Sequence, residues 1–368
     1  MLHFFRQIRR KLIQDNQFYK YLKYAIGEIV LVVLGILIAL YINNWNENRK
    51  SEERTKLLFT LVQKELLYNI ERTNYAIDRY INSDPLFYSV IKKKATYTDY
   101  QTRGELRRLI TDFDPDVKAQ NRAFRLLAES EGAFTSEQDT LVSLLRDLYG
   151  LDLIKVNAKA GLINDMVSDF RQKLKDEKPW YADLIGGVGI TKALNNEASE
   201  DMLSYFLNDP TYLNEVQDII SNGYGDHLKS ILGFRARSIS IYREITNYLN
   251  ETNDPMITNN IDDFSKYIGS YKNEKGSPSS YEQNWTAVIS KEPDNFWLKT
   301  YESDSLTDSH KVYPYREDSF IADWESSGEN LGVLNKFIQD EQTDKIGIIL
   351  LGDFGPKNKE RPTFLKID

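Results

Sequence analysis

One long apolar segment, Ala25–Ile42, constrains this chain more than any other feature of its sequence. It has the length of a short membrane span, although Glu28 lies inside it. The part after Glu28 is also short enough to be a buried core helix, which is the alternative. Tyr24 before the segment and Tyr41 and Trp45 at its end favour the membrane, because such rings gather at the two headgroup layers. A helix between the outermost rings rises roughly 31 Å, close to the hydrocarbon thickness.

The basic arm of residues 1–24 predicts how the span is oriented. Its single carboxylate is Asp15, and its cations are Arg6, Arg9, Arg10, Lys11, Lys20 and Lys23. The positive-inside rule therefore predicts a cytoplasmic N-terminus and an extracytoplasmic body. A cleaved signal peptide is disfavoured, because the charged region is too long and Ala39-Leu-Tyr41 is not a small-x-small cleavage site. We predict an uncleaved signal anchor.

The arm and the span each carry a further pattern. Apolar residues of the arm recur at helical spacing, which is typical of an amphipathic helix on an anionic leaflet; the alternative is a topology signal and nothing more. Gly35 and Ala39 form a small-xxx-small step, a weak signal for helix dimerisation. Glu28 is an ionisable residue in a span and hence a functional candidate, yet it is shallow enough to reach the cytoplasmic interface.

The start of the chain resembles a known family. The letters FFRQIRRKL, followed by KYAIGEIVLVVLGILIALYINNWNE from Lys23 to Glu47, are similar to an uncharacterised Bacteroidota family of single-pass inner-membrane proteins, a domain of unknown function. The resemblance is specific over about the first 50 residues and diffuse to about residue 250. It implies a Gram-negative inner membrane and a periplasmic body, and it brings no activity. Tyr41 stands where the family is expected to have Gln.

Composition excludes some partners for the body. The formal net charge is −8, and it becomes −12 without residues 1–42. So acidic a body is a poor candidate for nucleic acid, whose binding relies on neutralising phosphates. The chain contains no cysteine, which excludes disulfides and thiolate chemistry and fits an oxidising compartment.

The pattern predicts an α+β protein with four parts. They are a basic amphipathic arm (1–24), a transmembrane signal anchor (25–42), an irregular helical bundle (43–252) and an antiparallel β domain (260–368). An apolar stripe from Leu58 to Ile81 predicts a helix that ends at Ser83-Asp84-Pro85. Thr135, with Gln138 three residues on, is a capping box that predicts another helix start. Asn253-Asp254-Pro255 is expected to close the helical part.

The β domain is predicted to be a meander of about seven or eight strands, folded as a half-barrel. The predicted strands are Tyr267–Tyr271, Trp285–Lys291, Phe296–Glu302, His310–Tyr315, Ser319–Trp324, Gly332–Gln339, Lys345–Leu350 and Pro362–Ile367. The opening Tyr267-Ile-Gly-Ser-Tyr271 is similar to the YxGxY start of lipocalin-like modules attached to penicillin-binding-type hydrolases. Those modules are accessory domains, so the resemblance implies a fold and not catalysis.

No motif of a known catalytic, cofactor or metal site stands out, and we predict none. Asp112-Phe-Asp114-Pro-Asp116 mimics half an EF-hand loop but lacks the required Gly and Glu, so a solvated acidic loop is expected. Ser89 and Lys92 spell the serine–lysine pair of penicillin-binding proteins without its other elements. Asp353-Phe-Gly355 is expected to be a turn between strands.

Aromatic residues of the β domain leave two interpretations open. They line a pocket for a small apolar or sugar-like ligand, or they fill the core, which is the commoner role. The residues are Trp285, Phe296, Trp297, Tyr301, Tyr313, Tyr315 and Trp324.

Three functions are compatible with the sequence. We favour a membrane-anchored periplasmic binding or adaptor protein, whose partners are the lipid bilayer and a second protein or another copy of this chain. A structural subunit of an envelope complex comes second. A membrane-anchored hydrolase that acts through a carboxylate pair formed only in three dimensions comes third.

Overall fold

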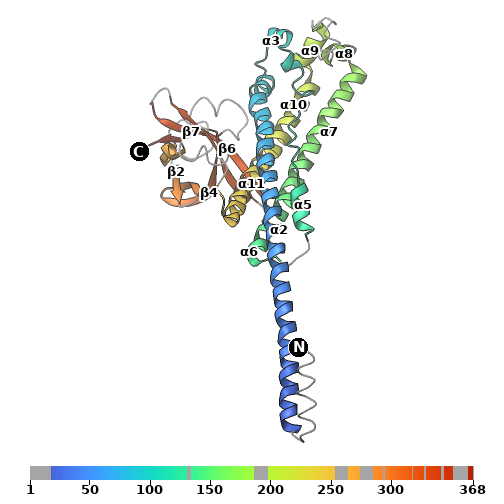
Figure 1. Ribbon diagram of the computed structural model, residues 1–368. Coiled ribbons are helices and arrows are strands. Elements are labelled where there is room, and N and C mark those ends of the chain that lie inside the picture. The colour runs from blue at the N-terminus through green and yellow to red at the C-terminus, as the bar shows by residue number, and fades with distance from the viewer. Residues whose placement is uncertain are drawn as a thin grey trace. The chain divides into compact units, whose positions relative to one another are not determined.

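The computed structural model confirms the α+β class (Figure 1). It describes residues 18–130, 134–185, 198–252, 264–273, 285–292, 295–316, 318–326, 329–340, 344–350 and 364–367. The chain divides into two units, Met1–Leu58 with Ser130–Gly132, and Phe59–Glu129 with Ala133–Asp368. Residues 1–17 of the arm, Asn253-Asp254-Pro255 and Asp353-Phe-Gly355 lie outside the described residues, whereas residues 18–24 of the arm belong to a helix.

Helix α2 (Phe18–Ile91) contains the apolar segment and then enters the core of the second unit. Side chains from Ile29 to Ile42 of the apolar segment are exposed, whereas Phe59, Val62 and Leu66 are fully buried. The predicted end at Ser83-Asp84-Pro85 is wrong, because the helix continues through Pro85 to Ile91. Proline inside a helix costs about 3 kcal/mol. Phe87 and Val90 are buried beyond it, at about 1.5–3 kcal/mol each, which offsets that cost.

The other helices form the irregular bundle that the sequence predicts. They are α3 (Tyr97–Thr102), α4 (Gly104–Arg107), α5 (Arg122–Ala128), α6 (Ser136–Asp147), α7 (Leu153–Glu177), α8 (Tyr181–Ile185), α9 (Glu200–Asn208), α10 (Pro210–Asn222) and α11 (Leu228–Leu249). The capping box of Thr135 and Gln138 is confirmed at the start of α6. Short π-helical turns, η1 (Leu148–Asp152) and η3 (Gly223–His227), join α6 to α7 and α10 to α11. Such turns often occur at functional positions.

Buried polar side chains of α2 hold the long connection that leads to α5. The Glu65 carboxylate accepts hydrogen bonds from the amides of Ala123 (2.7 Å) and Phe124 (3.3 Å), so α2 supplies an N-terminal cap for α5. Asn69 donates to the Gln120 carbonyl and accepts from its amide, both at 2.8 Å. This part of the bundle is therefore fixed by polar contacts as well as by apolar packing.

Eight antiparallel strands follow the helices in simple up-and-down order. They are β1 (Gly269–Asn273), β2 (Trp285–Glu292), β3 (Asn295–Glu302), β4 (Ser305–Arg316), β5 (Ser319–Ser326), β6 (Glu329–Gln339), β7 (Ile346–Leu350) and β8 (Phe364–Lys366). The predicted meander is confirmed, but it is a closed barrel and not a half-barrel, because β8 pairs with both β7 and β1. Closure pairs the first and last strands with each other, so neither is a free sheet edge among the described strands.

Aromatic side chains fill the barrel interior. Phe264, Phe296, Phe320 and Phe337 belong to one buried cluster there, and the rings of Tyr267 and Phe337 stack with centroids 3.7 Å apart. These side chains form a packed core inside the barrel, as expected for a barrel of eight strands.

The outer face of the barrel packs on α11, which lies beside β6 and β5 (Figure 1). Tyr313, Ile321 and Leu334 are buried on this face, one from each of β4, β5 and β6, and they are neighbours in strand register. Their side chains alternate with those of the interior, so these strands are buried on both faces. Helix α11 thus covers this part of the outer face of the barrel.

Candidate functional site

Two glycines set how closely α11 approaches the barrel. A Cβ atom on Gly233 of α11 would lie 2.7 Å from the Asn330 carbonyl carbon and 2.9 Å from Leu331 Cα. A Cβ atom on Gly332 of β6 would lie 2.5 Å from Leu232 Cβ. Since real Cβ atoms do not come so near to backbone atoms, only glycine fits at either position. Helix and strand therefore cross in backbone contact.

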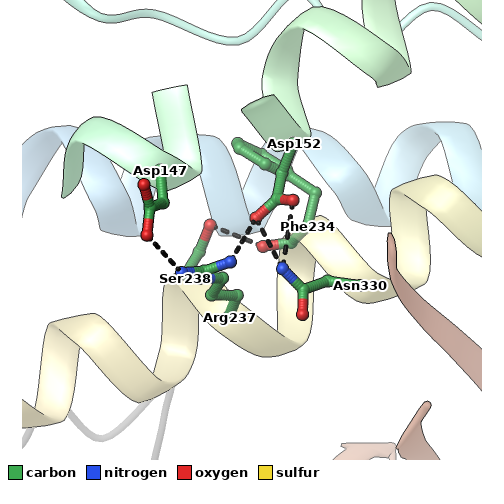
Figure 2. Close-up of polar contacts among 6 residues, drawn as sticks. All are labelled: Asp147, Asp152, Phe234, Arg237, Ser238 and Asn330. Carbon is green, nitrogen blue, oxygen red and sulfur yellow. Dashed lines mark hydrogen bonds and ion pairs between the residues drawn. The ribbon is translucent and has the colours of Figure 1, made fainter. Parts of the chain in front are cut away.

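A polar cluster fixes the crossing beside these glycines (Figure 2). Arg237 of α11 pairs with Asp147 and with Asp152, each at 3.3 Å. Asn330 of β6 donates to both carboxylate oxygens of Asp152, at 3.2 and 3.3 Å. Burial raises the pKa of the Asp152 carboxyl, while Asn330 and Arg237 act in the opposite direction. Asp152 thereby links η1, α11 and β6.

A cavity of about 330 Å³ lies against this crossing, and we name it the polar cavity. Its lining residues are Gly233, Ala236, Arg237, Ser240, Trp297, Ser309, His310, Lys311, Tyr313, Asp323, Asn330 and Leu331. They come from α11 and from strands β3 to β6, so both halves of the second unit contribute to the walls.

The barrel side of the polar cavity follows the strand register. Trp297 is paired with Lys311, and Asp323 with Gly332, so the cavity floor continues to the glycine crossing. The Lys311 amide donates to Asp323 Oδ1 at 2.7 Å, and Lys311 Nζ lies 6.0 Å from the centroid of the Trp297 ring. Burial raises the pKa of the Asp323 carboxyl, which its hydrogen bond from Lys311 opposes.

A second cavity, of about 370 Å³, is mainly apolar and has a charged rim. Its lining residues are Ile81, Asp84, Pro85, Tyr224, Leu228, Tyr315, Arg316, Asp318, Ser319, Leu334, Lys336, Ile338 and Ile349. The rim cations are engaged in ion pairs, Lys336 with Asp318 at 3.0 Å and Arg316 with Asp78. We name it the apolar cavity.

Arg235 is a buried cation that contacts Tyr315, one of the residues that line the apolar cavity. Arg235 of α11 donates to the Ile70 carbonyl of α2 at 2.9 Å, and its guanidinium lies 5.2 Å from the Tyr315 ring centroid. The Tyr315 hydroxyl donates to Asp78 at 3.1 Å. Burial lowers the pKa of Arg235 to about 10, so it remains charged at neutral pH. These contacts tie α2, α11 and β4 together.

His227 is a buried imidazole in η3. Its Nδ1 lies 2.9 Å from the Tyr80 hydroxyl, and burial lowers its pKa to about 4, so the ring is neutral at neutral pH. Nε2 has no hydrogen-bond partner among the described residues. No cluster of His, Asp and Glu that could hold a metal ion is found among the residues that the structure describes.

The residues predicted for the membrane anchor all lie on α2. Tyr41 and Trp45 are exposed, and the Arg49 guanidinium is 5.9 Å from the Trp45 ring. A Cβ atom on Gly35 would meet nothing within 4 Å, and Ala39 is exposed; Glu28 is half-buried. Tyr24 lies within the helix, and its side chain is outside the described part. Among the described residues, this is the one helix long and apolar enough to span a membrane.

The predicted aromatic group divides between the two roles. Phe296 belongs to the barrel core, and Trp285 packs against that core. Trp297 and Tyr313 line the polar cavity, whereas Tyr315 lines the apolar cavity. Tyr301 is half-buried outside both linings, and the Trp324 side chain is outside the described part.

The motif-like fragments have local structural roles. Asp114 and Asp116 accept hydrogen bonds from the amides two residues ahead, as in Asx turns, in agreement with an acidic loop. Ser89 donates to the Leu86 carbonyl within its own helix.

Sequence reasoning missed the residues that build the crossing: Asp152, Gly233, Arg237, Asn330 and Gly332. One signal was present. Glycine in a helix interior costs about 1 kcal/mol relative to alanine, so Gly233 within the otherwise regular helical block pointed to a close contact.

Comparison with known families adds one match. A family model described as "Family of unknown function (DUF6090)" matches residues 28–79, which cover most of the apolar segment and the following part of α2. The predicted resemblance to a domain of unknown function is thus confirmed for that region. No curated protein sequence matches the chain.

Proposed function

We propose that this chain is a single-pass membrane-anchored binding protein, with its N-terminus in the cytoplasm and its helical and barrel unit outside. The observation that carries the proposal is the change in environment along α2. Ile29, Leu34 and Ile38 of the apolar segment are at least half exposed, while Phe59 and later residues of the same helix are in the core. An exposed apolar surface of this length is typical of a helix that a bilayer surrounds.

The orientation follows from the basic arm under the positive-inside rule. The family resemblance supports a Gram-negative inner membrane and a periplasmic body of a Bacteroidota cell. The two cavities at the helix–barrel junction are sites where ligand recognition would occur.

A structural subunit of an envelope complex is the second candidate. Exposed apolar residues Leu151, Ile154 and Leu162 repeat along η1 and α7 at intervals that place them near one helical face. An apolar stripe of this kind is suited to a partner helix. It favours stable assembly with a partner that presents an apolar helix face.

Two measurements test the proposal. A C-terminal alkaline phosphatase fusion is expected to be active, because the enzyme needs an oxidising compartment; an inactive fusion would overturn the orientation. Crosslinking in intact cells, followed by mild purification and mass spectrometry, is expected to recover a defined partner or a homo-oligomer. Partners in constant stoichiometry that survive purification would favour the structural subunit. A clean monomer would contradict both the adaptor and the subunit.

A further inference from the structure

The polar cavity brings an aromatic ring and several planar hydrogen-bonding groups to one space. Trp297 comes from β3, Asp323 from β5 and Arg237 from α11. His310, Ser240 and Asn330 complete the polar lining. The volume of about 330 Å³ is at the lower end for cavities that hold small organic ligands.

Charges in this cavity are balanced. Three carboxylates, those of Asp147, Asp152 and Asp323, are matched by three cations, Arg237, Lys311 and Lys155, of which Lys155 acts on Asp152. An anion site needs an excess of cations aimed at the ligand, and a cation site needs an excess of carboxylates. The balance in the polar cavity suits a ligand without net charge.

The hydrogen-bonding groups are held in place before any ligand arrives. Asp323 is oriented by the Lys311 amide, which donates to its Oδ1. Arg237 is held by two carboxylates and has further N–H groups to donate. Fixed groups of this kind bind with a smaller loss of side-chain freedom.

Such a combination fits a hydroxyl-rich ring. The C–H faces of a sugar are apolar and pack on an aromatic side chain, while its hydroxyl groups donate to a carboxylate and accept from arginine, asparagine or histidine. We propose that the polar cavity binds a neutral saccharide, as one hexose unit or the end of an oligosaccharide. Trp297 packs against the sugar ring, and Asp323 and Arg237 bind its hydroxyl groups.

The apolar cavity does not share these features. Its rim cations Arg316 and Lys336 are paired with Asp78 and Asp318, and the remaining lining is largely aliphatic or aromatic. A sugar there would leave many hydroxyl groups without partners. The saccharide is therefore assigned to the polar cavity alone.

The test uses the full-length protein in lipid nanodiscs, which avoids glycoside detergents that would compete for the site. Saturation-transfer NMR is recorded with glucose, mannose, N-acetylglucosamine and the trisaccharides maltotriose, cellotriose and chitotriose. We expect transfer to at least one of these probes. Trp297→Ala and Asp323→Asn are each expected to weaken the binding of that probe at least tenfold, and Trp297→Phe to retain part of it.

Matched controls separate the site from the rest of the barrel. Tyr301→Ala removes another half-buried aromatic ring of β3, and Asp308→Asn changes an exposed carboxylate of β4; neither residue lines the cavity. Both variants are expected to bind the probe as the wild type does. Circular dichroism and thermal unfolding establish that each variant is folded.

Three results would overturn the saccharide assignment. They are no transfer to any probe, binding unchanged in folded Trp297→Ala and Asp323→Asn, and displacement of the sugar by inorganic phosphate, which would indicate an anion site. The saccharide class rests on the proposed binding function, but the two fail separately. A protein that is active as a phosphatase fusion and crosslinks to a partner, yet ignores all six sugars, loses only the saccharide.

Discussion

Gly233 of α11 and Gly332 of β6 lie at the point where the helix crosses the barrel. A side chain at either position would collide with the backbone of the other element. A Cβ on Gly332 would lie 2.9 Å from the Gly233 amide nitrogen, so the two backbones are in direct contact. The polar cluster of Asp152, Arg237 and Asn330 surrounds this contact. The crossing thus positions one wall of the polar cavity against the other.

Gly233→Ala is expected to destabilise the protein although alanine is the better helix former. The helical preference is worth about 1 kcal/mol, but overpacking against the Asn330 backbone costs about 1–3 kcal/mol, towards the upper end because a paired strand cannot move aside. Gly161→Ala in α7 is the matched control, since a Cβ there meets nothing within 4 Å. It is expected to be neutral or stabilising. Urea unfolding measures both variants, and equal effects would contradict the close crossing.

The elements of this fold were predictable to different degrees. Strand positions followed from local alternation and turn residues, so each predicted strand overlaps an observed one. Barrel closure was not predictable, because the pairing of β8 with β1 joins segments far apart in the sequence. The end of α2 was placed too early because Pro85 is a strong local signal that the buried Phe87 and Val90 override.

The candidate site was harder to predict for the same physical reason. Asp152 and Asn330 are 178 positions apart, and no periodicity connects them. Trp297 and Tyr313 were recognised as possible pocket residues because aromatic side chains in strands are candidates for both core and cavity. Only the packing of α11 on the barrel decides which role each one takes.

Asp152→Ala is expected to cost about 2–3 kcal/mol in the free energy of unfolding. It leaves Arg237 and the Asn330 amide without their shared acceptor in a largely buried position. Asp147→Ala removes the other carboxylate of Arg237, but that side chain is nearly half exposed, so a cost below about 1 kcal/mol is expected. A double-mutant cycle of Asp152→Ala with Asn330→Ala is expected to give a coupling of about 0.5–3 kcal/mol. Equal costs for the two aspartates would contradict the assigned geometry.

His227 makes stability depend on pH. Its pKa in the folded protein is lowered by burial, and to a smaller extent by Lys159, to about 4 from 6.5. Between these values the unfolded chain binds the extra proton, so stability rises with pH from about 4 to 6.5 and is lost as pH falls through this window. The full difference amounts to about 3 kcal/mol. His227→Gln is expected to remove this part of the pH dependence. The control is His310→Gln, which changes a half-buried histidine of the polar cavity and is expected to keep the pH dependence. Chemical unfolding at pH 4.5 and 7 decides between them.

Membrane anchoring is expected to depend on the apolar character of the segment before Trp45. Leu31→Arg combined with Leu34→Arg introduces two charges near the middle of the segment, at about 2.5–3.5 kcal/mol each, and is expected to release the protein from membranes or to prevent its insertion. The same pair of changes at Leu57 and Leu61, which are exposed farther along α2, is expected to leave anchoring intact, because these positions lie beyond the proposed bilayer. Extraction of membranes with alkaline carbonate, followed by immunoblotting, measures both variants. If the first variant stayed in the membrane fraction as firmly as the wild type, the helix would not be the anchor.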